Sequence, residues 1–452
     1  MMSKILIKNA KKIITCDEND RILSNVSILI DGPRVVEIGE DIAVGDAEII
    51  DASNMFVYPG LINTHHHLLQ VFTRNIPEIQ SMELFDWLMY LYEVWRKVDS
   101  EFVFYSSLIG MGELLKYGCT TCFDQHFAFP RGKGRDLIDR QMEAAEMLGI
   151  RFHAGRSSFT RGRKDGGLPP NDLTETADEI LTDCERLINK YHDPNEFSMR
   201  QVVVAPCSPF SVDDHIMIES AKLARDKGVR LHTHLTETLD EEAYTLEKYG
   251  KRPLAWAHGL GWTGSDVWYA HGIHFNTEEL DLLSQTQTGV AHCPVSNQKL
   301  SSGIARIPEM LNKNIPVGLG VDGCGSNDGS NLLAELRAAY LLHRLNSSAE
   351  APTGYEMLKI ATKGGAKLLG RNDIGSIEVG KAADLFLINV NRLEFVGATL
   401  DPASFLAVIG FNRPVDLTIV NGKVVAKEGV LLGIDEDEHK VKASEIVEEI
   451  YK

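Results

Sequence analysis

The sequence predicts an α/β protein in which a TIM-type (β/α)8 barrel carries a small β-sandwich domain built from both ends of the chain. In the centre, eight short apolar segments alternate with helical stretches, as they do in repeated βα units. At both ends, short strands follow one another with polar turns and no helices between them. An open doubly wound sheet is the alternative architecture for the centre.

Residues 1–58 are expected to form the N-terminal part of the small β domain. The alternating apolar residues of segment 26–30 and the break at Asp31–Gly32–Pro33 are hairpin signals. Residues 376–452 show the same pattern of short strands and polar turns. Asn421–Gly422, between two apolar runs, predicts a two-residue hairpin turn. The two ends are therefore expected to share one small domain.

Residues 59–375 are expected to form the barrel. Its strands are predicted in segments 56–67, 119–125, 151–158, 199–206, 229–237, 266–274, 288–296 and 316–323. After the first segment, a helix capped by Asp99 or Ser100 is expected to end at Gly118. Because no G-x-G-x-x-G motif follows a strand, the sequence does not predict a dinucleotide site.

The composition is that of an ordinary globular protein, but the net charge of the 452 residues is −18. This charge repels polyphosphates and anionic lipid surfaces, so a small-molecule substrate is favoured and neither nucleic acid nor membrane is an expected partner. No apolar run approaches the ~20 residues that span a bilayer. Seven scattered cysteines suit a reducing cytoplasm, and Cys119 and Cys122 are interpreted as reduced and structural. A homo-oligomer is left open.

Histidines gather at the predicted C-terminal ends of the barrel strands, where the active sites of this fold lie. His65 and His67 are two residues apart on strand one, so both side chains leave the same face. His234 ends strand five, His271 ends strand six and Asp322 ends strand eight. Two histidines from one strand, one from another and a carboxylate predict a divalent metal site with room for water.

The neighbouring histidines are given structural roles. His66 must point away from the face that His65 and His67 share, so we expect it to pack outside the barrel. His232 lies one layer deeper than His234 and is expected to make an interior hydrogen bond. His274 and His292 also lie at strand ends, as candidates for the pocket or for its support.

Five segments, in this order, resemble the amidohydrolase superfamily in its branch of aromatic and nucleobase deaminases: PGLINTHHH, HTHLTET, WYAHGIH, HCPVSNQKL and GLGVDGCGSND. GSIEVGKAADL and VDLTIVNGKVV resemble the small β domain of the same family. The resemblance implies a ligand set for one Zn²⁺, or Fe²⁺, per chain, made of His65, His67, His234 and Asp322. It also implies proton transfer by Glu237, His271 and Asp322. Strand four, VVVAPCSPF, has no lysine that could be carbamylated, which favours a mononuclear centre.

Three further stretches, ELFDWLMYLYEVW, RFHAGRSSFTRG and GVDGCGSNDGSNLL, resemble 8-oxoguanine deaminases and the related s-triazine hydrolases. The resemblance implies hydrolytic deamination of an amino-substituted heterocycle, with 8-oxoguanine giving urate and ammonia as the expected case. Four residues are expected to contact the substrate: Gln70, Trp87, Gln125 and Arg156. The amides could bind a lactam edge, the indole could cover a planar ring and the guanidinium could meet an oxo group. Core packing of Trp87, capping of loops by the two glutamines and a structural ion pair of Arg156 stay open as alternatives.

Several other functions remain as alternatives. They are a hydroxyatrazine-type aminohydrolase or a triazine chlorohydrolase, a guanine or pterin deaminase, and an inactive barrel scaffold. Chloride leaves without a proton, whereas Glu237, His271 and Asp322 together favour release of an amine. The intact ligand set argues against a scaffold. The acidic charge and the absence of an H-x-E…P-C-x-x-C signature argue against a nucleic-acid deaminase.

Overall fold

The computed structural model describes residues 4–43 and 45–452 of the chain, and its centre is a closed barrel of eight parallel strands. The order around the barrel follows the chain, with the last strand pairing with the first. The barrel strands are β8 (Leu61–Asn63), β10 (Cys119–His126), β11 (Arg151–Arg156), β12 (Arg200–Val204), β13 (Arg230–Leu235), β14 (Val267–His271), β15 (Gly289–His292) and β16 (Val317–Leu319). The predicted (β/α)8 barrel is confirmed, and an open doubly wound sheet is excluded.

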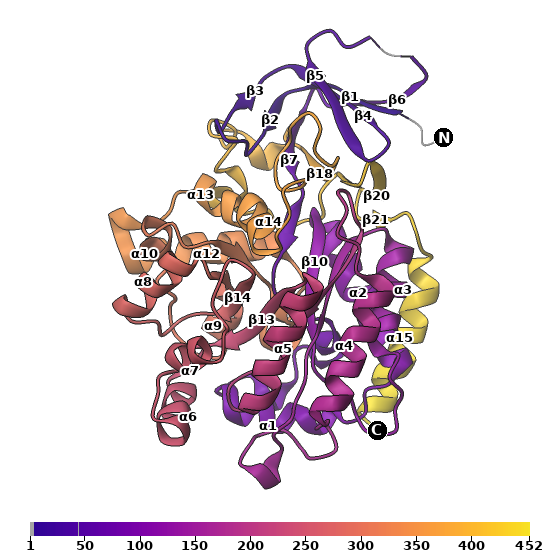
Figure 1. Ribbon diagram of the computed structural model, residues 1–452. Helices are drawn as coiled ribbons and strands as arrows, with labels where there is room; N and C mark the ends of the chain where they lie inside the picture. The colour runs from indigo at the N-terminus through magenta and orange to yellow at the C-terminus, as the bar shows by residue number, and fades with distance from the viewer. Residues whose placement is uncertain (1–3, 44) are drawn as a thin grey trace.

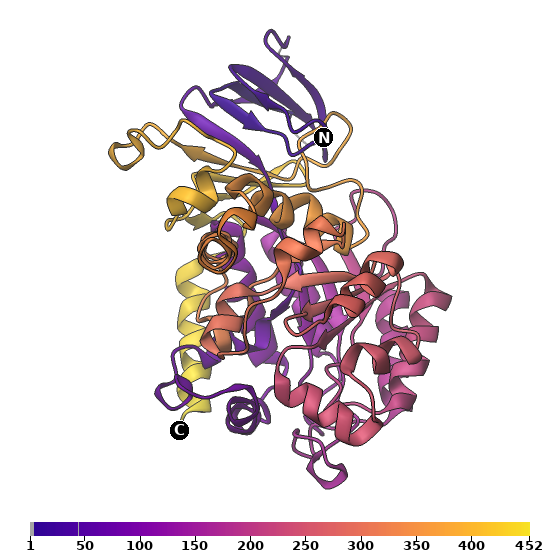
Figure 2. The ribbon, with the colours of Figure 1, turned by 90° about the vertical axis from the view of Figure 1, so that its left-hand side faces the viewer.

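Helices surround the barrel (Figures 1 and 2). They are α1 (Leu84–Trp95), α2 (Ser100–Lys116), α3 (Leu137–Leu148), α4 (Ala177–Tyr191), α5 (Asp214–Lys227), α6 (Leu239–Tyr249), α7 (Pro253–Gly259), α8 (Thr277–Thr286), α9 (Pro294–Lys299), α10 (Ile307–Asn312), α11 (Cys324–Asn327), α12 (Leu332–Ser347), α13 (Gly354–Lys359) and α14 (Gly365–Leu368). Helix α2 begins after Asp99, whose side chain accepts a hydrogen bond from the Phe102 amide, as the cap predicts. None of the helices within the described ranges is long and apolar enough to cross a membrane.

Strands from both ends of the chain form two facing sheets at one end of the barrel (Figure 1). One sheet contains, in spatial order, β5 (Arg34–Gly39), β4 (Val26–Asp31), β1 (Lys4–Ala10) and β6 (Ala47–Asp51). The other contains β21 (Val430–Leu431), β20 (Lys423–Lys427), β19 (Leu417–Val420), β18 (Leu385–Asn389), β7 (Met55–Pro59), β2 (Lys12–Ile14) and β3 (Ile22–Leu23). Residues of both sheets, among them Ile5, Ile28, Val57 and Leu385, share one core. The sandwich built from both chain ends is therefore confirmed.

The last helix of the chain belongs to a different layer from the terminal strands. Helix α15 (Glu436–Ile450) lies beside α2 on the outside of the barrel (Figure 1). It buries Ala443 and Ile450, while most of its side chains are charged and partly or fully exposed. This helix was not expected from the sequence, because so few apolar residues give its segment only a weak helical periodicity.

Two of the expected barrel strands are each interrupted near the C-terminal end of the barrel. These interruptions bring the candidate site residues of the two strands together. The first expected segment divides into β7, β8 and β9 (His66–His67), and the last divides into β16 and β17 (Asp322–Gly323). Beyond the barrel, β9 and β17 pair in parallel, with Asp322 opposite His66. This short pairing places Asp322 beside the histidines of the first strand.

Candidate metal centre

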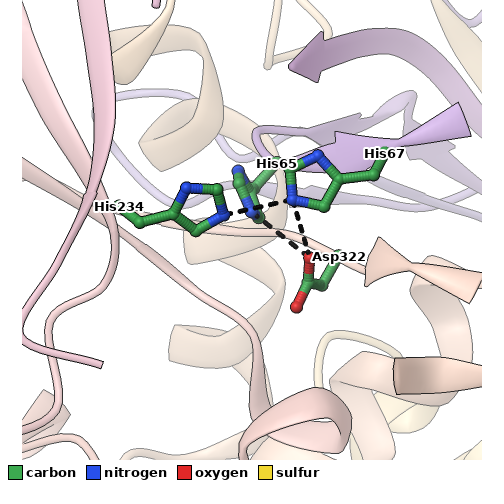
Figure 3. Close-up of side chains that lie close together, drawn as sticks. All are labelled: His65, His67, His234 and Asp322. Atoms are coloured by element: carbon green, nitrogen blue, oxygen red, sulfur yellow. Dashed lines mark hydrogen bonds and ion pairs between the residues drawn. The ribbon is translucent and has the colours of Figure 1, made fainter. Parts of the chain in front are cut away.

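Four side chains from three places in the barrel converge at its C-terminal end (Figure 3). His65, His67, His234 and Asp322 are buried, and each offers one ligand atom within 4.8 Å of the others. The Nε2 atoms of His67 and His234 are 3.1 Å apart, and Asp322 Oδ1 lies 3.3 Å from Nε2 of both His65 and His67. The structure thus brings together the four residues that the resemblance implied as ligands.

Backbone carbonyl groups fix the tautomers of two of these histidines. His67 Nδ1 lies 2.8 Å from the carbonyl oxygen of Gln125, and His234 Nδ1 lies 2.7 Å from that of Cys207. A carbonyl oxygen can only accept, so each Nδ1 must carry the proton and donate it. Each neutral ring therefore presents an unprotonated Nε2, and the two lone pairs face each other.

A relay through a second histidine fixes the tautomer of His65. His232 Nδ1 donates to the carbonyl oxygen of Trp268 at 3.0 Å, which leaves its Nε2 as an acceptor. His65 Nδ1 lies 2.9 Å from this Nε2 and donates to it. His65 Nε2 consequently carries a lone pair, and no group in residues 4–43 and 45–452 donates a hydrogen bond to it. The deeper position and interior hydrogen bond expected for His232 agree with this geometry.

The electrostatics of the four residues fit a divalent cation. Burial lowers the pKa of His67 to about 3 and lowers the pKa of His65 and His234 as well, so the three rings are neutral. Three imidazole lone pairs and a carboxylate that point at one another repel unless a cation lies between them. This donor set is typical of zinc.

Two further predicted residues lie next to the four. His271 Nε2 is 3.6 Å from Glu237 Oε2 and 3.9 Å from Asp322 Oδ2. His271 Nδ1 donates to Asn297 Oδ1 at 2.9 Å, so its Nε2 is free to accept a proton. Burial raises the pKa of Glu237 to about 7, which lets this carboxyl group both take up and release a proton near neutral pH. His271 and Asp322 both have left-handed backbone conformations, with φ of 69° and 62°.

Both oxygens of the Asp322 carboxylate accept hydrogen bonds. Ser296 Oγ and Ser326 Oγ donate to Oδ2 at 2.5 and 3.2 Å, and the Gly323 amide donates to Oδ1 at 2.7 Å. Ser296, Ser326 and Asn297 were not among the site residues expected from the sequence. The available signal was the position of Ser296 and Asn297 in the short helix α9, which follows the seventh barrel strand at the C-terminal end of the barrel.

A cavity opens onto these groups. Its wall is mostly apolar and aromatic: Leu84, Trp87, Leu88, Tyr92, Phe127, Phe159, Phe210 and Leu300. Polar groups at the wall include Gln70 and Ser208. Gln70 Oε1 accepts from the Gly325 amide at 3.1 Å, which fixes the orientation of the Gln70 amide. Gln70 and Trp87 thus line the cavity.

Gln125 and Arg156 are not among the residues that line this cavity. Gln125 Nε2 donates to the carbonyl oxygens of Ala205 and Pro206, at 3.0 and 3.3 Å. The buried guanidinium of Arg156 forms ion pairs with Glu175 at 2.8 Å and Asp183 at 2.9 Å. Both edges of the Arg156 guanidinium are thus paired, which favours the structural ion pair that the sequence left open as an alternative.

The remaining strand-end histidines lie outside the group of four. His66 Nε2 bonds to Ser330 Oγ at 2.9 Å, behind the first strand. His274 Nε2 donates to the carbonyl oxygen of Ser302 at 2.9 Å, and His292 Nε2 lies 3.1 Å from Nε2 of His343. None of these three is among the residues that line the cavity.

A barrel of this kind, with a buried His₃Asp cluster at the C-terminal ends of its strands, defines the chain as a metal-dependent hydrolase. Residues 56–425 match the amidohydrolase family. The chain belongs to that family.

Two curated relatives align with nearly the whole chain. Hydroxydechloroatrazine ethylaminohydrolase of Pseudomonas sp. (strain ADP) is 41% identical over 97% of this chain and 94% of the relative. The 8-oxoguanine deaminase of Pseudomonas aeruginosa is 42% identical over 96% of each chain. Among solved structures, the atrazine chlorohydrolase of Arthrobacter aurescens TC1 complexed with zinc is 34% identical, with a TM-score of 0.94 over 98% of this chain and 100% of that chain. The chain is thus similar to enzymes with different leaving groups.

Proposed function

We propose that this chain is a zinc-dependent hydrolytic deaminase that acts on an amino-substituted nitrogen heterocycle. The observation that carries the proposal is the convergence of three fixed imidazole lone pairs and the Asp322 carboxylate, with Glu237 and His271 beside them. The likeness to deaminases and aminohydrolases over almost the whole chain supports it. The zinc in the related chlorohydrolase structure supports the choice of metal.

His65, His67, His234 and Asp322 would hold the ion. When bound, the divalent cation would supply Lewis-acid chemistry that makes water a nucleophile at neutral pH. His271 Nε2 and Asp322 Oδ2 are placed to accept the proton that this water loses. Glu237 would protonate the ring nitrogen beside the carbon under attack, and the amine would leave with the proton collected by Asp322.

The substrate that we propose is 8-oxoguanine. In this reaction the C2–O bond forms from water and the C2–N bond breaks, so that 8-oxoguanine and water give urate and ammonia. The fixed Gln70 amide leaves its Nε2 to donate to an oxo group, and Trp87 offers a surface for a planar ring. The relative that acts on 8-oxoguanine, by its name, is 42% identical.

An N-ethylamino hydroxytriazine is the second candidate substrate. The apolar wall of the cavity favours it, because an alkyl substituent would gain from burial against leucine and phenylalanine side chains. The absence of Arg156 from the cavity also removes one group that was expected to meet an oxo-rich ring. The hydroxydechloroatrazine relative adds a reason to test it.

Ammonia and ethylamine release would decide between these substrates. Purified protein with its metal content determined by elemental analysis would be assayed on 8-oxoguanine, guanine, isoxanthopterin, adenosine and the hydroxytriazine. We expect one divalent ion per chain and the highest kcat/KM on 8-oxoguanine. Preferred release of ethylamine would select the second candidate. Active protein without metal, or with two tightly bound ions, would contradict the mononuclear mechanism.

A further inference from the structure

Three fully buried carboxyl groups lie one layer outside the metal centre. Within the described residues, none of them has an ion-pair partner at 4.0 Å or less. Instead, each accepts a hydrogen bond from a backbone amide in a segment that carries residues of the site. The pairs are Asp124 with Leu68 N at 2.5 Å, Glu241 with Thr236 N at 2.7 Å and Glu335 with Val295 N at 3.2 Å. The recurrence suggests a shared task of holding those segments in place.

Glu335 supplies a cap that helix α9 lacks. The side chain of Cys293, at the N-cap position, makes no capping hydrogen bond to α9, and Pro294 at the first position has no amide proton. The Val295 amide is therefore the first free donor of α9, and Glu335 Oε2 accepts from it across the gap between α12 and α9. The position of this short helix thus depends on a side chain from another helix.

The other oxygen of the same carboxylate binds the segment that follows Asp322. Asn327 Nδ2 donates to Glu335 Oε1 at 2.5 Å and also to the carbonyl oxygen of Val321 at 2.6 Å. Glu335 therefore ties α9 to α11, and Asn327 extends this connection to the backbone directly before Asp322. One carboxylate connects the two segments on either side of the ligand.

Helix α9 in turn orients two residues of the site. Ser296 donates to Asp322 Oδ2, and Asn297 accepts the proton of His271 Nδ1. We propose that Glu335 is a positioning residue that, through α9 and α11, holds Asp322 and His271 toward the metal centre. This inference rests on the proposed function, because it assumes that the four ligands bind an ion.

The shape of the contact explains why an acid is required at this position. Two nitrogen donors converge on Glu335, one on each oxygen. A glutamine can accept through only one oxygen, and its own NH₂ group would face the second donor. Glu335→Gln is therefore nearly isosteric, yet with the Asn327 amide in its present orientation it breaks one of the two connections. A flip of that amide would keep the contact with residue 335 but lose the bond to the Val321 carbonyl oxygen.

The test compares Glu335→Gln with Glu350→Gln, a matched change at an exposed position after the same helix. Zinc affinity is measured by competition with a chromophoric chelator. The values of kcat and KM are measured on the amino substrate that the wild type turns over. We expect Glu335→Gln to weaken zinc binding or lower kcat by about 10- to 100-fold, as losses of supporting partners of metal ligands do. KM should stay unchanged, because Glu335 is not among the residues that line the cavity. Glu350→Gln should match the wild type.

A double-mutant cycle with Ser296→Ala asks whether Glu335 acts through α9. If it does, Glu335→Gln should have a smaller effect on zinc affinity when Ser296 is already alanine. Should Glu335→Gln fail to fold, Asn327→Ala removes the bonds of Asn327 to Glu335 and to the Val321 carbonyl oxygen, leaves the contact between Glu335 and Val295 intact, and must still weaken zinc binding. Wild-type zinc affinity and kcat in the folded variants, or fully additive effects, would overturn the proposal. Chelator competition needs no substrate, so failure of the deaminase assignment would remain distinguishable.

Discussion

Removing the acceptor behind His65 should weaken metal binding without touching any ligand. In His232→Phe the proton on His65 Nδ1 loses its acceptor at 2.9 Å, while the phenyl ring can pack between Phe123 and Trp268 as the imidazole does. A buried donor without a partner costs about 1–3 kcal/mol. The metal-free protein can avoid this cost by moving the proton to Nε2, where Asp322 Oδ1 lies 3.3 Å away.

The metal-bound protein cannot move the proton in this way, because the ion would bind the Nε2 lone pair of His65. The penalty therefore falls on the bound state alone, and ~1–3 kcal/mol corresponds to roughly 5- to 150-fold weaker binding at 1.36 kcal/mol per tenfold. The zinc dissociation constant would be measured by chelator competition at a fixed neutral pH. His232→Gln is the control, since its amide oxygen can accept from His65 and should retain part of the affinity. If His232→Phe binds zinc as tightly as the wild type, the relay does not set the tautomer.

Three further predictions follow from the buried charges. Glu237→Gln should keep the metal content, because Glu237 is not one of the four ligands, and should lower kcat by about 10²- to 10⁴-fold; near-normal turnover would remove Glu237 from the mechanism. Arg156→Met should lower the free energy of unfolding by about 3–5 kcal/mol in urea titrations, because Glu175 and Asp183 lose their partner, and it should change KM equally for rings with and without an oxo group. Burial raises the pKa of Asp124 to about 7, so the folded chain holds a proton that the unfolded chain loses above pH ~4. The contribution of this proton to the free energy of unfolding is therefore lost as the pH rises toward about 7, by at most ~1.4 kcal/mol per pH unit. The free energy of unfolding of the wild type should fall more steeply with pH than that of Asp124→Asn, and equal slopes would contradict this prediction.

The parts of the structure that the sequence predicts well are those governed by local periodicity. Eight apolar segments that alternate with helices predict the barrel. Asn421–Gly422 forms the expected turn, with φ of 50° and 75°. The interruptions before β9 and β17 were not predicted, because they depend on pairing between segments about 250 residues apart. Gly320, between β16 and β17, illustrates this dependence, since a Cβ there would lie 2.8 Å from the Cβ of His65.

The placement of Arg156 has a specific physical cause. Arg156 ends a barrel strand, and the resemblance of its segment to 8-oxoguanine deaminases made it a candidate for the pocket. Alternation along β11 decides otherwise, because Phe152 and Ala154 pack in the core that the barrel shares with its helices, and Arg156 lies on their face. Its partners accordingly lie outward, with Asp183 on α4. The two-residue period places Arg156 on the outward face of β11. The same period fails for His271, whose left-handed φ of 69° breaks the alternation after Val267 and Tyr269.

The chemistry of the site depends on the barrel itself more than on the loops around it. His67 donates its proton to a carbonyl oxygen of β10, and His234 donates to the carbonyl oxygen of Cys207, after β12. His65 donates to His232, which in turn donates to a carbonyl oxygen of β14. Each acceptor comes from a segment other than the one that carries the ligand. A shift of one residue in these strand pairings would replace each acceptor, free the tautomers and let Nε2 carry the proton, which would turn a metal ligand into a hydrogen-bond donor. Closure of the barrel in a single register is thus what makes three ordinary histidines a ready set of Lewis bases.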